Sequence, residues 1–247
     1  GAVPAPACAP ATGKRVAVVG AGPGGLSAAY YLSLMGHEVT IYEKQPKLGG
    51  MLRYGIPSYR LPRERLQEDI DAILSTGITV KTGVDVGNAV SIQKLTKEYD
   101  AVYIAIGAHQ NRPLEIEGED SAGVLSAVEM LRDIGNGQYP DVRGKRVLVI
   151  GGGNVAMDAA RSAVRLGAET VGIVYRRRKA DMTALPEEVE SAIGEGCEVM
   201  ELQVPLRIEA DSDGRAAALW VRPQIIGKTD AGGRPRPFCL LYTSDAA

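Results

Sequence analysis

The segment that decides the fold occurs twice in the chain, as GKRVAVVG at Gly13–Gly20 and as GKRVLVIG at Gly144–Gly151. Each copy is followed by a stretch of small residues, a single glycine and a second run rich in β-branched residues, at Val39–Tyr42 and at Val171–Tyr175. An apolar strand, a glycine turn, a helix and another strand in this order make a βαβ unit, whose parallel strands are buried on both faces. The repeat therefore predicts an α/β protein with two Rossmann-like domains, each built on a mainly parallel sheet.

The composition is that of a globular protein with a hydrophobic core. Apolar residues make up 45% of the 247 residues and charged residues 23%, which excludes a disordered tail, a collagen-like fibre and a coiled coil. The 28 Lys and Arg nearly balance the 30 Asp and Glu, so the charge favours neither nucleic acid nor an anionic membrane as a partner. Residues 16–36 carry no charge, but glycines interrupt this run, and we expect a strand, turn and helix there instead of a membrane span.

The cysteines and histidines exclude several other chemistries. Cys8, Cys197 and Cys239 have no paired spacing, so they cannot form the disulfide framework of a secreted protein. They are also one short of the four thiolates that hold a usual iron–sulfur cluster. No Cys-x-x-Cys pair is present for disulfide reduction, and His37 and His109 have no metal-ligand spacing. We therefore expect a cytoplasmic protein without a metal site.

Between and after the two repeats, the apolar pattern predicts further elements. A helix is expected to begin near Pro62 and to end at Gly77. We expect strands at 78–81 and 101–106, and then a helix at 187–195, strands at 198–203, 206–210 and 217–224, and a Gly/Pro turn region at 229–237. The expected organisation is a linker at 1–12, a first nucleotide-binding domain at 13–112, a second at 113–237 and an atypical tail at 238–247.

The first glycine motif, Gly20-Ala21-Gly22-Pro23-Gly24-Gly25, has the spacing of a dinucleotide-binding turn. Its first glycine permits the tight turn, its second lets a pyrophosphate approach the backbone, and its third lets the helix pack close to the strand. Glu43 ends the second strand, where a carboxylate can accept hydrogen bonds from both ribose hydroxyls. This order predicts a site for a dinucleotide with free ribose hydroxyls, such as FAD.

The second motif, Gly151-Gly152-Gly153-Asn154-Val155-Ala156, is followed by cations instead of an acid. Arg176 and Arg177 stand close to the position that Glu43 has in the first copy. A carboxylate there would repel a 2′-phosphate, whereas a guanidinium can bind one through two parallel hydrogen bonds. The charge run also fits an ordinary solvated loop, but its position favours phosphate binding, so the second domain is expected to bind NADP(H) in preference to NAD(H).

Longer stretches resemble one family. Residues 20–25, Glu43-Lys44, Gly49-Gly50-Met51-Leu52-Arg53-Tyr54-Gly55-Ile56-Pro57 and the second motif with Tyr175-Arg176-Arg177 closely resemble the glutamate synthase small (beta) subunit family. That family includes related FAD/NAD(P)H oxidoreductases and the matching part of dihydropyrimidine dehydrogenase. The resemblance covers about residues 13–237 and implies two domains of the glutathione-reductase type.

The resemblance also implies roles for individual residues. It assigns Lys44, Gly50, Met51, Leu52, Arg53, Ile56 and Pro57 to FAD binding, brings Val86 to the adenine, and makes Ala105 and Gly107 part of a strand that crosses beside FAD. The residues alone would assign Ile56, Pro57 and Val86 to core packing.

The function implied by the resemblance is a flavin-dependent NAD(P)H oxidoreductase module. Hydride passes from NADPH to FAD, and electrons continue to iron–sulfur clusters of a partner subunit or a further domain. Because the cofactors carry this chemistry, no catalytic side chain is expected. Two alternatives stay open, a dinucleotide-binding fragment without turnover and a flavin monooxygenase. In the family a later segment closes the FAD domain, and nothing after Pro237 matches it, so an incomplete FAD domain is expected.

Overall fold

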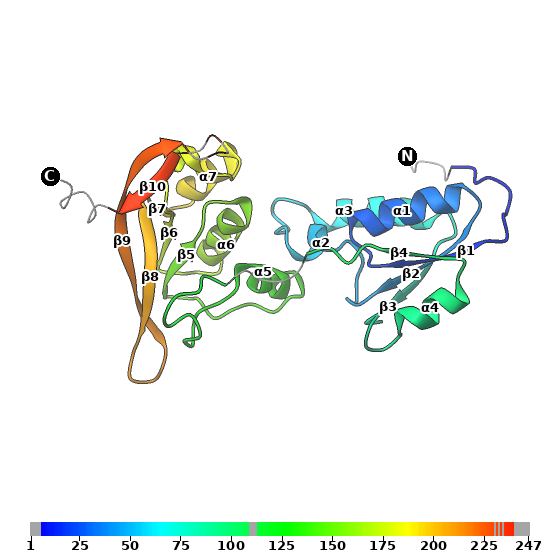
Figure 1. The fold of residues 1–247 in the computed structure, drawn as a ribbon, viewed down its shortest axis with the longest axis horizontal. Helices are drawn as coiled ribbons and strands as arrows, with labels where there is room; N and C mark the ends of the chain where they lie inside the picture. Colours follow the sequence, from blue (N-terminus) through cyan, green and yellow to red (C-terminus); the bar gives the residue numbers. More distant parts are fainter. Residues whose placement is uncertain (1–5, 109–112, 230, 232, 234, 240–247) are drawn as a thin grey trace. The chain divides into compact units, whose positions relative to one another are not determined.

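The computed structural model describes residues 6–108, 113–229, 231, 233 and 235–239. The start of the expected linker (1–5), the expected domain boundary (109–112) and most of the expected tail (240–247) lie outside the described residues. The chain divides into two compact units, Gly1–His109 and Gln110–Ala247, and each contains one copy of the repeat (Figure 1). We call them unit 1 and unit 2.

Unit 1 is built on a four-stranded parallel sheet with the strand order β3-β2-β1-β4. Its elements are β1 (Arg15–Val19), α1 (Pro23–Leu34), β2 (Glu38–Glu43), α2 (Met51–Tyr54), α3 (Arg63–Leu74), β3 (Thr79–Thr82), α4 (Ile92–Glu98) and β4 (Ala101–Ile104). The predicted βαβ unit is thus β1, α1 and β2. Because the strands are parallel, their carboxyl ends meet at one edge of the sheet, which is where open α/β sheets bind ligands.

Both faces of this sheet are covered by helices (Figure 1). On one face Val18 and Ile41, both fully buried, pack with α1 and α3. On the other face Ala17 and Val19 pack with Leu95 of α4. Successive residues of a strand point to opposite faces, so a strand covered on both sides is apolar at every position. This explains why the repeat reads as an uninterrupted apolar run.

Unit 2 combines a parallel and an antiparallel sheet. Its elements are α5 (Ala127–Gly135), β5 (Arg146–Ile150), α6 (Asn154–Arg165), β6 (Thr170–Val174), a short 3₁₀ helix η1 (Lys179–Asp181), α7 (Pro186–Gly194), β7 (Glu198–Met200), β8 (Gln203–Ala210), β9 (Ala216–Thr229) and β10 (Pro235–Cys239). Strands β5, β6 and β7 form a parallel sheet in that order, whereas β8, β9 and β10 pair antiparallel. The predicted α/β fold with mainly parallel sheets is confirmed, with one antiparallel sheet added.

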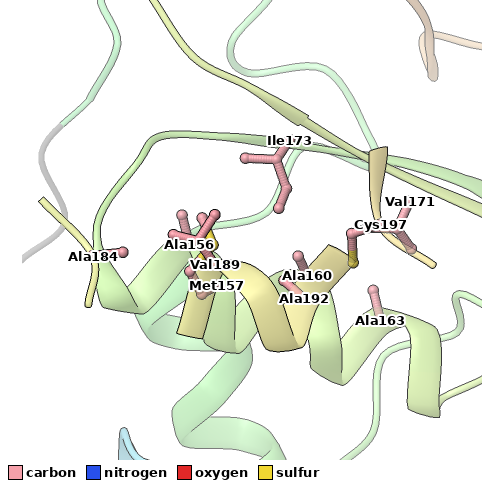
Figure 2. Close-up of a cluster of buried hydrophobic side chains, with 10 residues drawn as sticks. All are labelled: Ala156, Met157, Ala160, Ala163, Val171, Ile173, Ala184, Val189, Ala192 and Cys197. Carbon is pink, nitrogen blue, oxygen red and sulfur yellow. The ribbon is translucent and has the colours of Figure 1, made fainter. Parts of the chain in front are cut away.

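The core of unit 2 lies between α6, α7 and the parallel sheet. Ala156, Ala160 and Ala163 recur every three or four residues along α6, so they share one face of the helix. Figure 2 shows them in one cluster with Ile173 of β6 and Val189 of α7. Small side chains let the helix approach the strands closely, and the stretch of small residues after the second glycine motif serves this packing.

The Gly/Pro turn region predicted at residues 229–237 is wrong in part. Strand β9 continues to Thr229, and Pro235–Cys239 forms the edge strand β10. A proline cannot donate a ladder hydrogen bond, but an edge strand has a free side on which none is needed. Phe238 and Cys239, the first residues of the expected tail, complete this strand.

The single strand predicted at residues 198–203 is also wrong. The chain turns between β7 and β8, where Leu202 has a φ of 57°, in the left-handed region that ends regular strand pairing.

The uncharged run at residues 16–36 forms β1, the glycine turn and α1, as expected. Among the helices that the structure describes, each is too short or too polar to cross a membrane.

Candidate nucleotide-binding sites

The turn after β1 needs glycine at two positions for steric reasons. Gly20 has a φ of 100°, and a Cβ atom there would collide with the carbonyl oxygen of Ala105. A Cβ atom on Gly25 would collide with the carbonyl oxygen of Gly20, so the helix can pack this close to the turn only with glycine. Ala105 itself extends the sheet, since its amide donates to Val19 O at 2.8 Å. The strand predicted at 101–106 is therefore too long, since β4 ends at Ile104, but the backbone of Ala105 still lies directly beside the first glycine.

The two helices that follow the glycine motifs begin without a side-chain cap. The N-cap residues are Gly22 for α1 and Gly153 for α6, and neither first turn contains an acidic residue. Helices α3 and α7 also lack a side-chain cap, but they have Glu64 or Glu187 and Glu188 in their first turns. Helices α4 and α5 are capped by Ser91 and Ser126, whose hydroxyls accept first-turn amides. Uncapped first-turn amides, with the positive end of the helix dipole, favour an anionic group such as a pyrophosphate.

Glu43, at the carboxyl end of β2, is buried beside the first turn and 7% exposed. Its carboxylate accepts the amide of Ala21 at 2.7 Å and the amide of Gln45 at 2.7 Å. The bond to the turn was not foreseen from the sequence, because it depends on how β1 and β2 lie side by side. A carboxylate offers about four acceptor positions, so these two bonds leave capacity for ribose hydroxyls.

The Gly49-Gly50 segment lies against the same turn. The Gly49 amide donates to Ala21 O at 2.8 Å, and a Cβ atom on Gly50 would lie 2.6 Å from the Cα atom of Gly22. Gly50 has a φ of 52° and is the N-cap of α2, in which Met51, Leu52 and Arg53 follow. The structure thus brings Gly20–Gly25, Glu43, Gly50 and Ala105 together.

The arginine of α2 has partners within unit 1. Arg53 is buried and donates to Leu48 O and, at 2.6 Å, to Gln67 Oε1. Arg63 donates to Leu52 O and to Ile56 O at 2.7 Å, which fixes the loop that carries Ile56 and the buried Pro57. These contacts hold the backbone of the motif in place, whatever further role the side chains have.

Lys44 and Val86 also have local contacts. Lys44 Nζ lies 2.9 Å from Asp85 Oδ2, and hydrogen bonds from Lys44 and Asn88 hold the pKa of Asp85 below its usual value. Val86 packs beside the cluster that contains Tyr42. Gly107, the last residue assigned to the crossing strand, is exposed and has a φ of 68°.

The turn of unit 2 is bonded by the segment 183–185, a contact that the sequence alone did not predict. Gly152 O accepts the amides of Thr183 and Ala184, both at 3.0 Å, and Asn154 Oδ1 accepts the amide of Leu185 at 2.9 Å. A Cβ atom on Gly152 would lie 2.5 Å from the ring of Tyr175. Gly151 has a φ of 141°, and Val155 is 43% exposed at the start of α6.

The three arginines after β6 differ in environment. Arg178 Nε lies 2.9 Å from Asp181 Oδ2, and this bond raises the pKa of Arg178. Arg176 is exposed, whereas Arg177 is 7% exposed and its Nε donates to Pro235 O at 3.1 Å. Arg176 and Arg177 line a cavity of about 620 Å³ at this end of the sheet, together with residues of β9 and β10.

Comparison with known proteins identifies relatives along most of the chain. The family model described as pyridine nucleotide-disulphide oxidoreductase matches residues 14–216. The chain is 45% identical over 228 residues to the NADP(+)-dependent formate dehydrogenase subunit beta of Moorella thermoacetica, over 92% of this chain and 32% of that protein. It is 36% identical over 235 residues to the glutamate synthase [NADPH] small chain of Escherichia coli (strain K12), over 91% of this chain and 50% of that protein.

The chain thus spans half or less of the length of these curated relatives. Among solved structures, FprA of Mycobacterium tuberculosis in complex with NADPH matches with a TM-score of 0.77 and 21% identity, over 92% of this chain and 67% of that one, which shows a common fold. The predicted resemblance to the glutamate synthase small subunit is confirmed by these relatives. Because the family model matches most of the sequence, the chain belongs to the pyridine nucleotide-disulphide oxidoreductase family.

Proposed function

We propose that this chain is the flavin and nicotinamide module of an NADPH-dependent oxidoreductase, in which unit 1 binds FAD and unit 2 binds NADPH. The observation that carries the proposal is the difference between two otherwise similar turns. The turn of unit 1 has the buried carboxylate of Glu43 beside it, and the turn of unit 2 has Arg176 and Arg177 at the end of its second strand. An acid suits free ribose hydroxyls and repels a phosphate, whereas arginines attract one.

The residues of both turns fit these cofactors. Gly22 and Gly153 leave the first turns of α1 and α6 without a side-chain cap, so backbone amides can bind a pyrophosphate in each unit. Glu43 would accept the ribose hydroxyls of FAD, and Gly50 would keep the backbone close to the dinucleotide. Bound FAD supplies the capacity to accept a hydride from NADPH and to pass electrons on. The side chains then have to bind and orient the two cofactors, and no acid or base of the protein is needed.

The electrons that leave the flavin need an acceptor outside the two units. The relatives are named as a beta subunit and a small chain, which supports a partner subunit for this chain as well. We propose that the partner, or a further domain, holds an iron–sulfur acceptor. We also propose a cytoplasmic location, with which the three unpaired cysteines agree.

The proposal is tested by loading the full chain with FAD and adding NADPH in the absence of oxygen. We expect the yellow flavin absorbance to bleach, and an artificial one-electron acceptor to restore it. Binding of both cofactors without bleaching would contradict the proposal and favour a dinucleotide-binding fragment without turnover. Oxygen-dependent consumption of NADPH with hydroxylation of a substrate, and no reduction of the artificial acceptor, would favour a flavin monooxygenase.

A further inference from the structure

The cavity at the end of β6 is lined by cations from two separate parts of unit 2. Arg176 and Arg177 come from the segment after β6, while Lys228 and Arg236 come from β9 and β10. None of the described residues that line the cavity is acidic. A concave site that gathers this much positive charge attracts an anion with several negative charges.

The hairpin of β9 and β10 is fixed relative to β6. Arg177 is more than nine-tenths buried, and its Nε donates to Pro235 O at 3.1 Å. The carbonyl oxygen of Arg177 accepts the amide of Leu202, which precedes β8. Within the hairpin the ring of Phe238 lies where a side chain at Gly227 would be, so Gly227 lets the two strands pack closely. The positions of Lys228 and Arg236 at the cavity therefore follow from the fold.

The neighbouring Arg178, in contrast, is paired within its own loop and does not belong to the cavity. Its guanidinium bonds Asp181 through two contacts of 2.9 and 3.0 Å, and it does not line the cavity. Arg176, Lys228 and Arg236 are exposed on the cavity side, where a ligand can reach them.

We propose that Lys228 and Arg236 are specificity-determining residues that complete a binding site for the 2′-phosphate of NADP(H). The inference rests on the proposed function, because it takes the nucleotide to lie on the turn at Gly151–Gly153. A ribose bound there reaches the end of the second strand of the βαβ unit, which is where Arg176 stands. The phosphate is then held from one side by the arginines after β6 and from the other side by the hairpin.

The test compares binding of NADP⁺ and NAD⁺ to the full chain by calorimetry, because the two ligands differ only in the 2′-phosphate. The variants are Arg236→Ser and Lys228→Ser, with Arg176→Ser as the positive control. The matched control is Arg215→Ser, which removes the same charge from an exposed residue that directly precedes β9, at the opposite end of that strand from Lys228. Fluorescence of the single tryptophan, Trp220 on β9, checks that the hairpin stays folded.

We expect Arg236→Ser and Lys228→Ser each to lower the affinity for NADP⁺ about tenfold, since each removes a charge-assisted contact with the phosphate. The affinity for NAD⁺ should stay the same. Arg215→Ser should change the affinity for neither NADP⁺ nor NAD⁺. Weaker NADP⁺ binding in Arg176→Ser, but not in the two hairpin variants, would overturn the role of the hairpin and leave the proposed function intact. An equal loss of NADP⁺ and NAD⁺ would show that the hairpin only supports the fold, and equal binding of both ligands by the unmutated chain would contradict the NADPH assignment itself.

Discussion

In unit 1 the turn after β1 is bonded by a carboxylate as well as by the Gly49 loop, whereas in unit 2 the turn after β5 is bonded by the Thr183–Ala184 loop. Glu43 accepts the Ala21 amide in unit 1. In unit 2 the Gly152 carbonyl accepts two amides from the Thr183–Ala184 loop. Both turns are thus bonded by a neighbouring loop, and the turn of unit 1 has the carboxylate of Glu43 in addition. On the proposed function this difference matters, because the turn of unit 2 does not depend on an acid and arginines can stand at the end of β6.

The helices also approach their turns differently. In unit 1 the third motif position is Gly25, and a Cβ atom there would collide with Gly20 O. In unit 2 the same position is Ala156, and even a Cβ atom added to Gly151 would lie 3.4 Å from the Cβ atom of Ala156, at an ordinary contact distance. The closer packing in unit 1 therefore depends on a glycine, and that in unit 2 does not.

The largest effect is expected for Gly25→Ala. The added methyl group collides with backbone that cannot move without opening the turn, and we expect unit 1 to lose about 3 kcal/mol of stability. The measurement is urea unfolding followed by circular dichroism for both units and by Trp220 fluorescence for unit 2.

The control for this variant is Gly24→Ala, where an added Cβ atom meets nothing within 4 Å. Ala156→Gly in unit 2 should cost less, about 1–2 kcal/mol, from helix propensity and the loss of one buried methyl group. Equal stability of Gly25→Ala and Gly24→Ala would contradict the packing difference.

A smaller effect, confined to unit 1, is expected for Glu43→Ala. Removing the carboxylate leaves the Ala21 amide without this acceptor and costs about 1–3 kcal/mol, and on the proposed function it also removes the ribose acceptor of FAD. We expect FAD affinity to fall at least about tenfold while NADP⁺ affinity stays the same. Glu38→Ala, at the exposed start of the same strand, is the matched variant. Unchanged flavin content of Glu43→Ala would show that Glu43 does not bind the ribose.

The smallest effect concerns acid stability in unit 2, where Arg161 and Arg165 of α6 bond Glu195 after α7. Hydrogen bonds from Arg165 and then Arg161 lower the pKa of Glu195. A carboxyl with a lowered pKa stabilises the fold above its unfolded pKa, about 4.3, and loses this contribution as the pH falls through the lower, folded value. Glu195→Gln should therefore be less stable at neutral pH, by at most about 1 kcal/mol, and the difference should shrink in acid. Trp220 fluorescence during unfolding measures this difference in stability, and an equal difference at neutral and at acid pH would contradict the role of the Glu195 carboxylate.

The parts of both units that depend on local sequence were predictable. Apolar runs such as Val16–Val19 could only be strands covered on both faces, and the need for glycine at Gly20 and Gly25 follows from the motif. Helix α5 is missing from the elements predicted from the sequence, although Ser126 followed three residues later by Glu129 is the pattern of a capping box. The parts that depend on distant contacts were not predictable. The bond of Asn154 to Leu185, and β10 with its two prolines, follow from pairing between segments far apart in the chain.

The most direct test of the difference between the two turns is a competition experiment on the unmutated chain. FAD is titrated by calorimetry in the absence and presence of saturating NADP⁺, and NADP⁺ and NAD⁺ are then titrated into the FAD-loaded chain. We expect one FAD site whose affinity does not change with NADP⁺, and a second site that binds NADP⁺ at least about tenfold more tightly than NAD⁺. Displacement of FAD by NADP⁺, or equal affinity for NADP⁺ and NAD⁺, would contradict the assignment of one turn to FAD and the other to NADPH.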